Sequence, residues 1–246
     1  MTGELTVRAV VDGRDVPRDQ TLAWEARRLP RAAKRIRLEP PPGELPDQRL
    51  EFARAKADLG ADEVRRRLRL PLRASEAATL PVVVLSRRGR RFSVCDLYVT
   101  GGDAAEFVAW FSDTGRPDYE LSMLAANPDH FLIATAPDGR QEVIETTGGS
   151  PLPARFLIDY VDVADLVTPV DPEFPLVLAG VARSRSGRAI GGVRHQFRPT
   201  DDGFHARLAV EFPILTPPYL IQQHCLHLAV EFTNWIEAAF ADRGLH

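Results

Sequence analysis

Apolar and polar residues alternate with a period of two over 4–11, and several later stretches are short apolar runs that turn residues bound. Both patterns are typical of strands. The expected strands are 4–11, 80–86, 92–99, 131–136, 141–147, 154–161, 175–182, 190–198 and 203–212. Asp138-Gly139 and Asp202-Gly203 are turn signals of the kind that join neighbouring strands. Short strands at regular spacing favour a meandering antiparallel sheet.

Helical patterns occupy the N-terminal third and the end of the chain. Helices are predicted at 21–28, 46–59, 61–70 and 104–112, and over 219–241. Asp103 is a suitable N-cap for the fourth, and Pro218 suits the start of the last. An antiparallel sheet closed by one long terminal helix is the layout of a helix-grip fold, the α+β architecture of START and Bet v1 proteins. We therefore expect a helix-grip domain over 80–246 and a small, mainly helical arm or cap over 1–79.

Composition and charge restrict the classes of function. Neither an apolar run of about 18 residues nor a signal-peptide pattern is present, which predicts a cytoplasmic protein without membrane contact. Residues 1–91 hold 21 basic and 13 acidic residues, and 92–246 hold 10 and 21. The arginine runs at 65–69 and 87–91 lack interleaved aromatic residues, so we expect a solvated or acid-paired surface and no nucleic-acid partner.

The two cysteines, Cys95 and Cys225, form no Cys-x-x-Cys pair, so neither a disulfide framework nor a thiolate zinc site is expected. The chain also lacks a glycine-rich phosphate loop and a Gly-x-Ser-x-Gly elbow. Nucleotide chemistry and serine hydrolysis are therefore disfavoured.

The terminal helix carries a polar stripe. His224, His227, Glu231 and Asn234 fall within about 80° of one another on a helical wheel, yet apolar residues surround them on nearly every side. The stripe could be a solvent face or could line a cavity. His227 and Glu231 are spaced four apart, so both can reach one metal ion, and further ligands would have to come from elsewhere.

Upstream motifs supply such ligands and resemble the 2,4-diacetylphloroglucinol hydrolase family, which includes phloretin hydrolase. In chain order the matching pieces are Ala109-Trp110-Phe111, Pro128-Asp129-His130, Glu145-Thr146-Thr147-Gly148-Gly149-Ser150-Pro151, His195 with Asp202-Gly203 and Arg207, and His227 to Glu231. The resemblance covers about residues 103–241. It departs from the family just before Pro128, where 120–126 replace a tyrosine and a tryptophan, so the substrate pocket is expected to differ.

The resemblance implies a zinc ion held by two histidines and two glutamates, which correspond to His130, Glu145, His227 and Glu231. His224 remains an alternative to His227, although only His227 has a glutamate four residues later. The implied reaction is hydrolysis of a carbon–carbon bond between an acyl group and a polyhydroxylated aromatic ring. The implied partner is a small hydrophobic aromatic or polyketide-like substrate.

Four further residues are candidates for catalysis or substrate binding. His195 could protonate the ring, because an imidazole titrates near neutral pH. Tyr160 is a second catalytic candidate, and Tyr119 and Asn127 are candidate substrate contacts. Purely structural roles fit these four residues as well.

Two other functions remain open. The chain could be a helix-grip protein that binds or cyclises a polyketide-like molecule without metal, or it could keep the metal and catalyse another step. The N-terminal arm could cap the cavity or form a homodimer. Zinc content separates the metal-free function from the other two.

Overall fold

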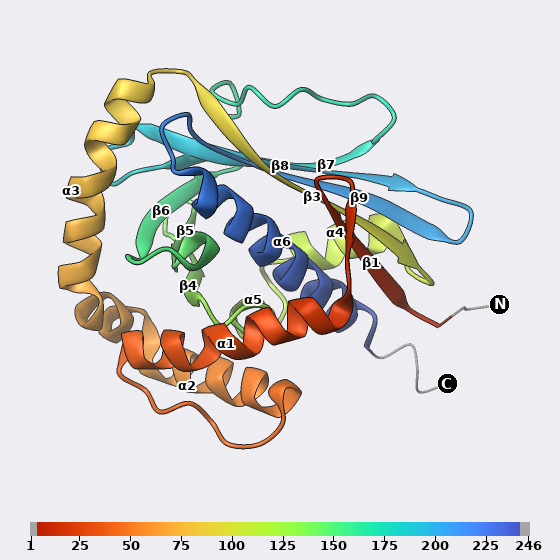
Figure 1. The fold of residues 1–246 in the computed structure, drawn as a ribbon, viewed down its shortest axis with the longest axis horizontal. Coiled ribbons are helices and arrows are strands. Elements are labelled where there is room, and N and C mark those ends of the chain that lie inside the picture. The colour runs from red at the N-terminus through yellow and green to blue at the C-terminus, as the bar shows by residue number, and fades with distance from the viewer. Residues whose placement is uncertain (1–3, 242–246) are drawn as a thin grey trace.

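The structure of residues 4–241 is a computed structural model, in which nine strands form one antiparallel sheet (Figure 1). The strands are β1 (Thr6–Val11), β2 (Arg14–Val16), β3 (Arg90–Thr100), β4 (His130–Thr135), β5 (Gln141–Glu145), β6 (Ala154–Asp159), β7 (Leu176–Arg183), β8 (Ala189–Pro199) and β9 (Gly203–Pro213). Their order across the sheet is β2-β1-β3-β9-β8-β7-β6-β5-β4. From β4 to β9 the strands meander, so each pairs with its neighbour in sequence.

Six α-helices surround or cross this sheet in the described residues. They are α1 (Arg18–Ile36), α2 (Leu45–Arg67), α3 (Arg69–Ser86), α4 (Ala104–Ser112), α5 (Tyr119–Ala125) and α6 (Pro218–Ala239), with a short 3-10 helix η1 (Thr147–Gly149). Figure 1 shows α6 crossing the middle of the molecule, with the sheet bending around it and α1 on its other side. The predicted α+β class and long C-terminal helix are confirmed.

Two apolar cores hold these layers together. The larger lies between α6, α4 and the sheet, and Phe107 is at its centre, in contact with Phe197, Phe204 and Phe232. The smaller joins the N-terminal helices to the far end of the sheet, and its members include Ile36, Phe52, Phe131 and Ile144. The N-terminal helices therefore cover β4 and β5, the strands that carry two of the proposed metal ligands.

Several local predictions are confirmed by the structure. Asp103 caps α4, since its side chain accepts a hydrogen bond from the Glu106 backbone N–H at 2.9 Å. Pro218 starts α6. The predicted break between the helices at 46–59 and 61–70 is confirmed, because Gly60 is non-helical, with φ +73°, and divides α2 into two segments, the second of which ends at Arg67.

The predicted strand at 80–86 is wrong, because these residues complete α3. The run Val82-Val83-Val84 favours a strand locally, but the helix buries Leu72 and Val83 and places Ser75, Thr79 and Val82 along one cavity wall at helical spacing. Tertiary packing overrides the local preference here.

The N-terminal third is joined to the rest of the structure in two ways. The strand β1 pairs along β3, from Thr6 opposite Thr100 to Val10 opposite Asp96. The helix α3 runs across residue 79, the predicted end of the arm. The division at that residue stays a prediction. Among the described residues, none of the helices has the length and apolar character needed to cross a bilayer.

Candidate metal centre

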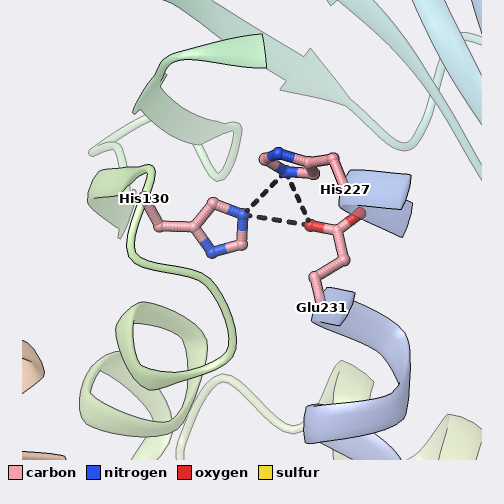
Figure 2. Close-up of side chains that lie close together, drawn as sticks. All are labelled: His130, His227 and Glu231. Carbon is pink, nitrogen blue, oxygen red and sulfur yellow. Dashed lines mark hydrogen bonds and ion pairs between the residues drawn. The ribbon is translucent and has the colours of Figure 1, made fainter. Parts of the chain in front are cut away.

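Four side chains from three separate elements meet at one point inside the protein. His130 is the first residue of β4 and Glu145 the last of β5, and the two are register partners. His227 and Glu231 lie one turn apart on α6. Figure 2 shows His130 reaching from its strand toward the two helix residues. All four side chains are buried. The structure therefore brings together the four residues that the resemblance implies as ligands, inside the protein.

The donor atoms are spaced like the corners of a metal coordination shell. His130 Nε2 lies 3.0 Å from Glu231 Oε2 and 3.3 Å from His227 Nε2, and the last two atoms are 3.3 Å apart. Glu145 Oε2 lies 3.7 Å from the Nε2 of His130 and 3.9 Å from that of His227. Tetrahedral bonds of about 2.0–2.1 Å place ligand atoms about 3.3 Å apart. The cluster can therefore hold a metal ion.

Neighbouring groups orient these ligands. The Nδ1 of His130 lies 3.0 Å from the carbonyl oxygen of Met123, which can only accept, so Nδ1 carries the proton and Nε2 presents its lone pair to the cluster. Thr147 Oγ1 donates to Glu145 Oε1 at 3.0 Å, leaving Oε2 toward the histidines. Such outer contacts are typical of metal sites, where they fix the tautomer and angle of each ligand.

Without a cation, the cluster is a set of strongly coupled buried charges. Burial alone would lower the pKa of His227, but the carboxylates of Glu231 and Glu145 outweigh burial and raise it to about 9. Burial opposes ionisation of Glu231 as well, yet His227 and His130 hold the pKa of that carboxyl well below its usual range. The pocket thus stabilises positive charge at the point where the four donors converge.

A buried ion pair from α1 fixes the turn before His130. Arg28 donates from Nε and Nη2 to the two carboxylate oxygens of Asp129, each at 2.7 Å. Thr146 Oγ1 donates to the same carboxylate, and the Thr146 backbone N–H donates to the Asp129 carbonyl at 3.1 Å. The residues next to His130 and Glu145 are therefore bonded to each other.

Lys56 of α2 also donates hydrogen bonds to the backbone of this turn. Its buried Nζ donates to the carbonyl oxygens of His130 at 2.6 Å and Leu124 at 3.1 Å.

Asn127, a predicted substrate contact, is fully buried in this turn, where its Oδ1 accepts from the Asp129 backbone N–H at 3.0 Å. It is not among the residues that line the cavity, and its contacts are those of a residue that shapes the turn.

The cluster forms part of the wall of a cavity of about 330 Å³. The remaining wall is mostly apolar and includes Phe111, Ile133, Phe156, Leu178, Phe232 and Trp235. Trp235 stacks on the His130 ring, with centroids 5.6 Å apart. A cavity of this size and lining suits a small, largely apolar molecule with a few polar groups.

His195 of β8 lies in the same wall, with its ring edge-on to Phe232 at a centroid distance of 4.7 Å. Burial lowers its pKa to about 4. The imidazole is therefore neutral near pH 7, whereas an ordinary pKa would let it act as either acid or base, so it could protonate a ring only after taking up a proton itself.

The two candidate tyrosines are linked through one glutamine. Tyr160 lines the cavity, and its hydroxyl donates to Gln141 Oε1 at 2.9 Å. Gln141 Nε2 donates to the Tyr119 hydroxyl at 2.7 Å. Tyr119 is buried and is not among the cavity-lining residues, so the structure places it behind Gln141 and not in the wall.

Sequence reasoning missed the residues that support the site from the N-terminal helices. Arg28 and Lys56 lie about 100 and 70 positions from the residues that they contact, and no local pattern distinguishes them from other basic residues of an arginine-rich segment.

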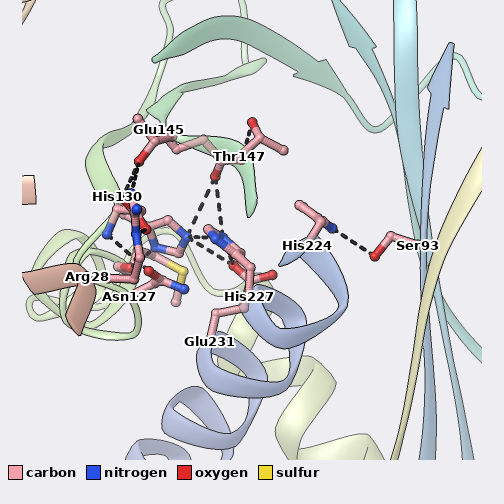
Figure 3. A network of polar contacts seen from close by, with 12 residues as sticks. Arg28, Ser93, Asn127, His130, Glu145, Thr147, His224, His227 and Glu231 are labelled. Carbon is pink, nitrogen blue, oxygen red and sulfur yellow. Dashed lines mark hydrogen bonds and ion pairs between the residues drawn. The ribbon is translucent and has the colours of Figure 1, made fainter. Parts of the chain in front are cut away.

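His224 belongs to a second buried group, with Glu145 and His227, whose ligand atoms lie within 4.8 Å of one another. Figure 3 shows Glu145, His224 and His227 together.

The fold and the site define an α+β protein with a buried histidine and glutamate cluster that can hold a metal ion. No family model matches the chain, and a search of curated proteins finds no similar sequence.

Proposed function

We propose that the protein is a zinc-dependent hydrolase with a helix-grip fold. Its proposed substrate carries an acyl group on a polyhydroxylated aromatic or polyketide-like ring, and the carbon–carbon bond between them is cleaved. The observation that carries the proposal is that His130, His227 and Glu231 bring donor atoms within 3.0–3.3 Å of one another, with Glu145 Oε2 3.7 and 3.9 Å from the two histidines, in the wall of a mostly apolar cavity. Two imidazoles and two carboxylates are a ligand set that zinc accepts.

Zinc bound there would supply a Lewis acid for the acyl carbonyl and a water that ionises near pH 7. In the net reaction, the oxygen of water bonds to the acyl carbon and the bond from that carbon to the ring breaks. The bonding electrons stay on the ring carbon, which gains a proton. The products are a carboxylic acid and the deacylated ring.

The cavity residues would handle the proton and orient the ring. His195 would take up the proton released by water and return it to the ring carbon, and its low pKa favours the second of these transfers. The Tyr160 hydroxyl already donates to Gln141, so its oxygen can accept from a ring hydroxyl. Tyr119 would act indirectly, by holding Gln141.

Metal analysis of the purified protein tests the metal centre. We expect one zinc per chain in the wild type and a loss of most of it in His227→Ala and Glu231→Gln. His195→Gln is the matched control, because it changes a cavity histidine outside the ligand set and should retain zinc. Wild-type protein without stoichiometric metal would exclude this function and favour a metal-free helix-grip protein that binds or cyclises a polyketide-like molecule.

The reaction itself is tested with acylated polyhydroxybenzenes in ¹⁸O-labelled water. Hydrolysis predicts release of a carboxylic acid that carries one ¹⁸O atom from solvent. A zinc-loaded protein that converts such compounds without releasing acid would instead catalyse another step, such as cyclisation.

A further inference from the structure

His224 lies one turn before His227 on α6, in the wall of the same cavity, and the proposed ligand set leaves it without a role. Its side chain is buried, and its ligand atom lies within 4.8 Å of those of Glu145 and His227. This group of three therefore shares Glu145 and His227 with the proposed ligand set. An ion held by Glu145 and His227 has the His224 ring beside it.

The contacts of His224 leave one ring nitrogen for such an ion. Ser93 Oγ donates to Cys225 Sγ at 3.4 Å, and its oxygen lies 3.0 Å from His224 Nδ1. The serine proton is directed at sulfur, so Nδ1 donates to the serine oxygen, and Nε2 carries the lone pair. The hydrogen bonds found among the described residues include none to this Nε2. An outer hydrogen bond on one nitrogen with the other unprotonated is the arrangement found in metal-bound histidines.

The His224 ring contacts two other rings, and its backbone packs against a glycine. It stacks on His227 with centroids 5.1 Å apart and planes 8° from parallel, and it meets Phe212 edge-on at 4.9 Å. At its backbone, Gly148 packs so closely that a Cβ there would lie 2.8 Å from the His224 nitrogen. This contact brings η1, which directly follows the Glu145 segment, against the turn of α6 that carries His224.

We propose that His224 is a fifth, exchangeable ligand of the ion held by His130, Glu145, His227 and Glu231. The inference rests on the proposed metal centre and extends it. His130, His227 and Glu231 bring donor atoms within 3.0–3.3 Å of one another, and Glu145 lies 3.7 and 3.9 Å from the two histidines, so His224 adds to this set and does not replace His227. Zinc expands from four to five ligands readily. Release of this one imidazole frees a position that a substrate oxygen can take.

X-ray absorption spectroscopy of the zinc-loaded protein counts the imidazole ligands directly. We expect three in the wild type and two in His224→Leu, together with an affinity for zinc that falls about tenfold. His195→Leu is the matched control and keeps three, because His195 lines the cavity outside both groups. His224→Gln, closer in size and polarity, should also show two, and circular dichroism verifies that each variant folds.

The outcomes separate this inference from the proposed function. Two imidazoles in the wild type, unchanged in His224→Leu, would overturn the role of His224 and leave the metal centre intact. A wild-type protein that binds no stoichiometric zinc would overturn both.

Discussion

His130 and Glu145 face each other across the β4–β5 pair as direct register partners, with Nε2 and Oε2 3.7 Å apart. Both side chains point toward α6, which supplies His227 and Glu231. An ion at this point joins a strand pair to a helix that lies about 100 residues further along the chain. The metal centre would therefore be a structural cross-link as well as a site for chemistry.

Removal of the metal is expected to lower the thermal stability of the protein. An ion that binds only the folded chain stabilises it by about 2.7 kcal/mol when its free concentration is 100 times the dissociation constant. The measurement is the melting temperature with a chelator and after zinc is restored. His227→Ala is the control, and its melting temperature should not respond to either addition. A wild type that melts equally in both conditions would contradict the cross-link.

Loss of the Arg28 side chain is expected to destabilise the fold by about 3 kcal/mol, because it leaves the buried Asp129 carboxylate without its charge partner. Urea unfolding of Arg28→Met, Asp129→Leu and the double variant measures the coupling. The double variant should lose less than the two single variants together. Arg8→Met is the control, since its pair with Asp15 is exposed and should contribute less than about 1 kcal/mol.

The stability of the protein is expected to fall in mild acid through His195. Burial lowers the folded pKa of this side chain to about 4, from the model-peptide value of 6.5. Between these values the unfolded chain binds a proton that the folded chain does not. The free energy of unfolding therefore rises with pH across this window. As pH falls through the window, the His195 contribution of up to about 3 kcal/mol is lost.

Comparison with His195→Asn isolates this contribution, because asparagine does not titrate. Urea unfolding at pH 4.5 and pH 7, with a chelator present for both proteins, gives the difference. The wild type should lose more stability than the variant on acidification. Equal losses of stability in the two proteins would mean that the pKa of His195 is not lowered in the folded state.

Bulk added to the inner face of α3 is expected to block the cavity. Thr79 lines the cavity, so an indole at that position would occupy much of its volume of about 330 Å³. Thr79→Trp should lose most of its binding of an apolar fluorescent dye. Ala77→Trp is the matched control, because Ala77 is exposed, belongs to the same helix and is not among the cavity-lining residues. Similar dye binding by both variants would show that α3 does not bound the ligand space.

Patterns that depend on neighbouring residues predicted much of this fold. The short strand-like runs and turn signals from Phe131 onward predicted the β4–β9 strands, and the proline-free run after Pro218 predicted α6. The spacing of His227 and Glu231 pointed to one helix face, which the structure confirms. These features follow from helical and strand periodicity, which the chain carries in its own order.

Features that depend on distant contacts could not be predicted in the same way. Residues 80–86 have the composition of a strand, and only the packing of α3, which buries Leu72 and Val83, explains their helical form. The support that Arg28 gives to Asp129 depends on how α1 packs, which no local pattern encodes.

The contacts of Lys56 have a consequence for how the site can change during evolution. This lysine donates to the backbone carbonyl of His130 at 2.6 Å and is fully buried in α2. Substitutions along α2 could therefore tilt one ligand and adjust reactivity while every cavity-lining side chain stays the same. Sequence drift in the helices before β3 would thus be a route to a different ligand geometry at the proposed site that inspection of the pocket alone would overlook.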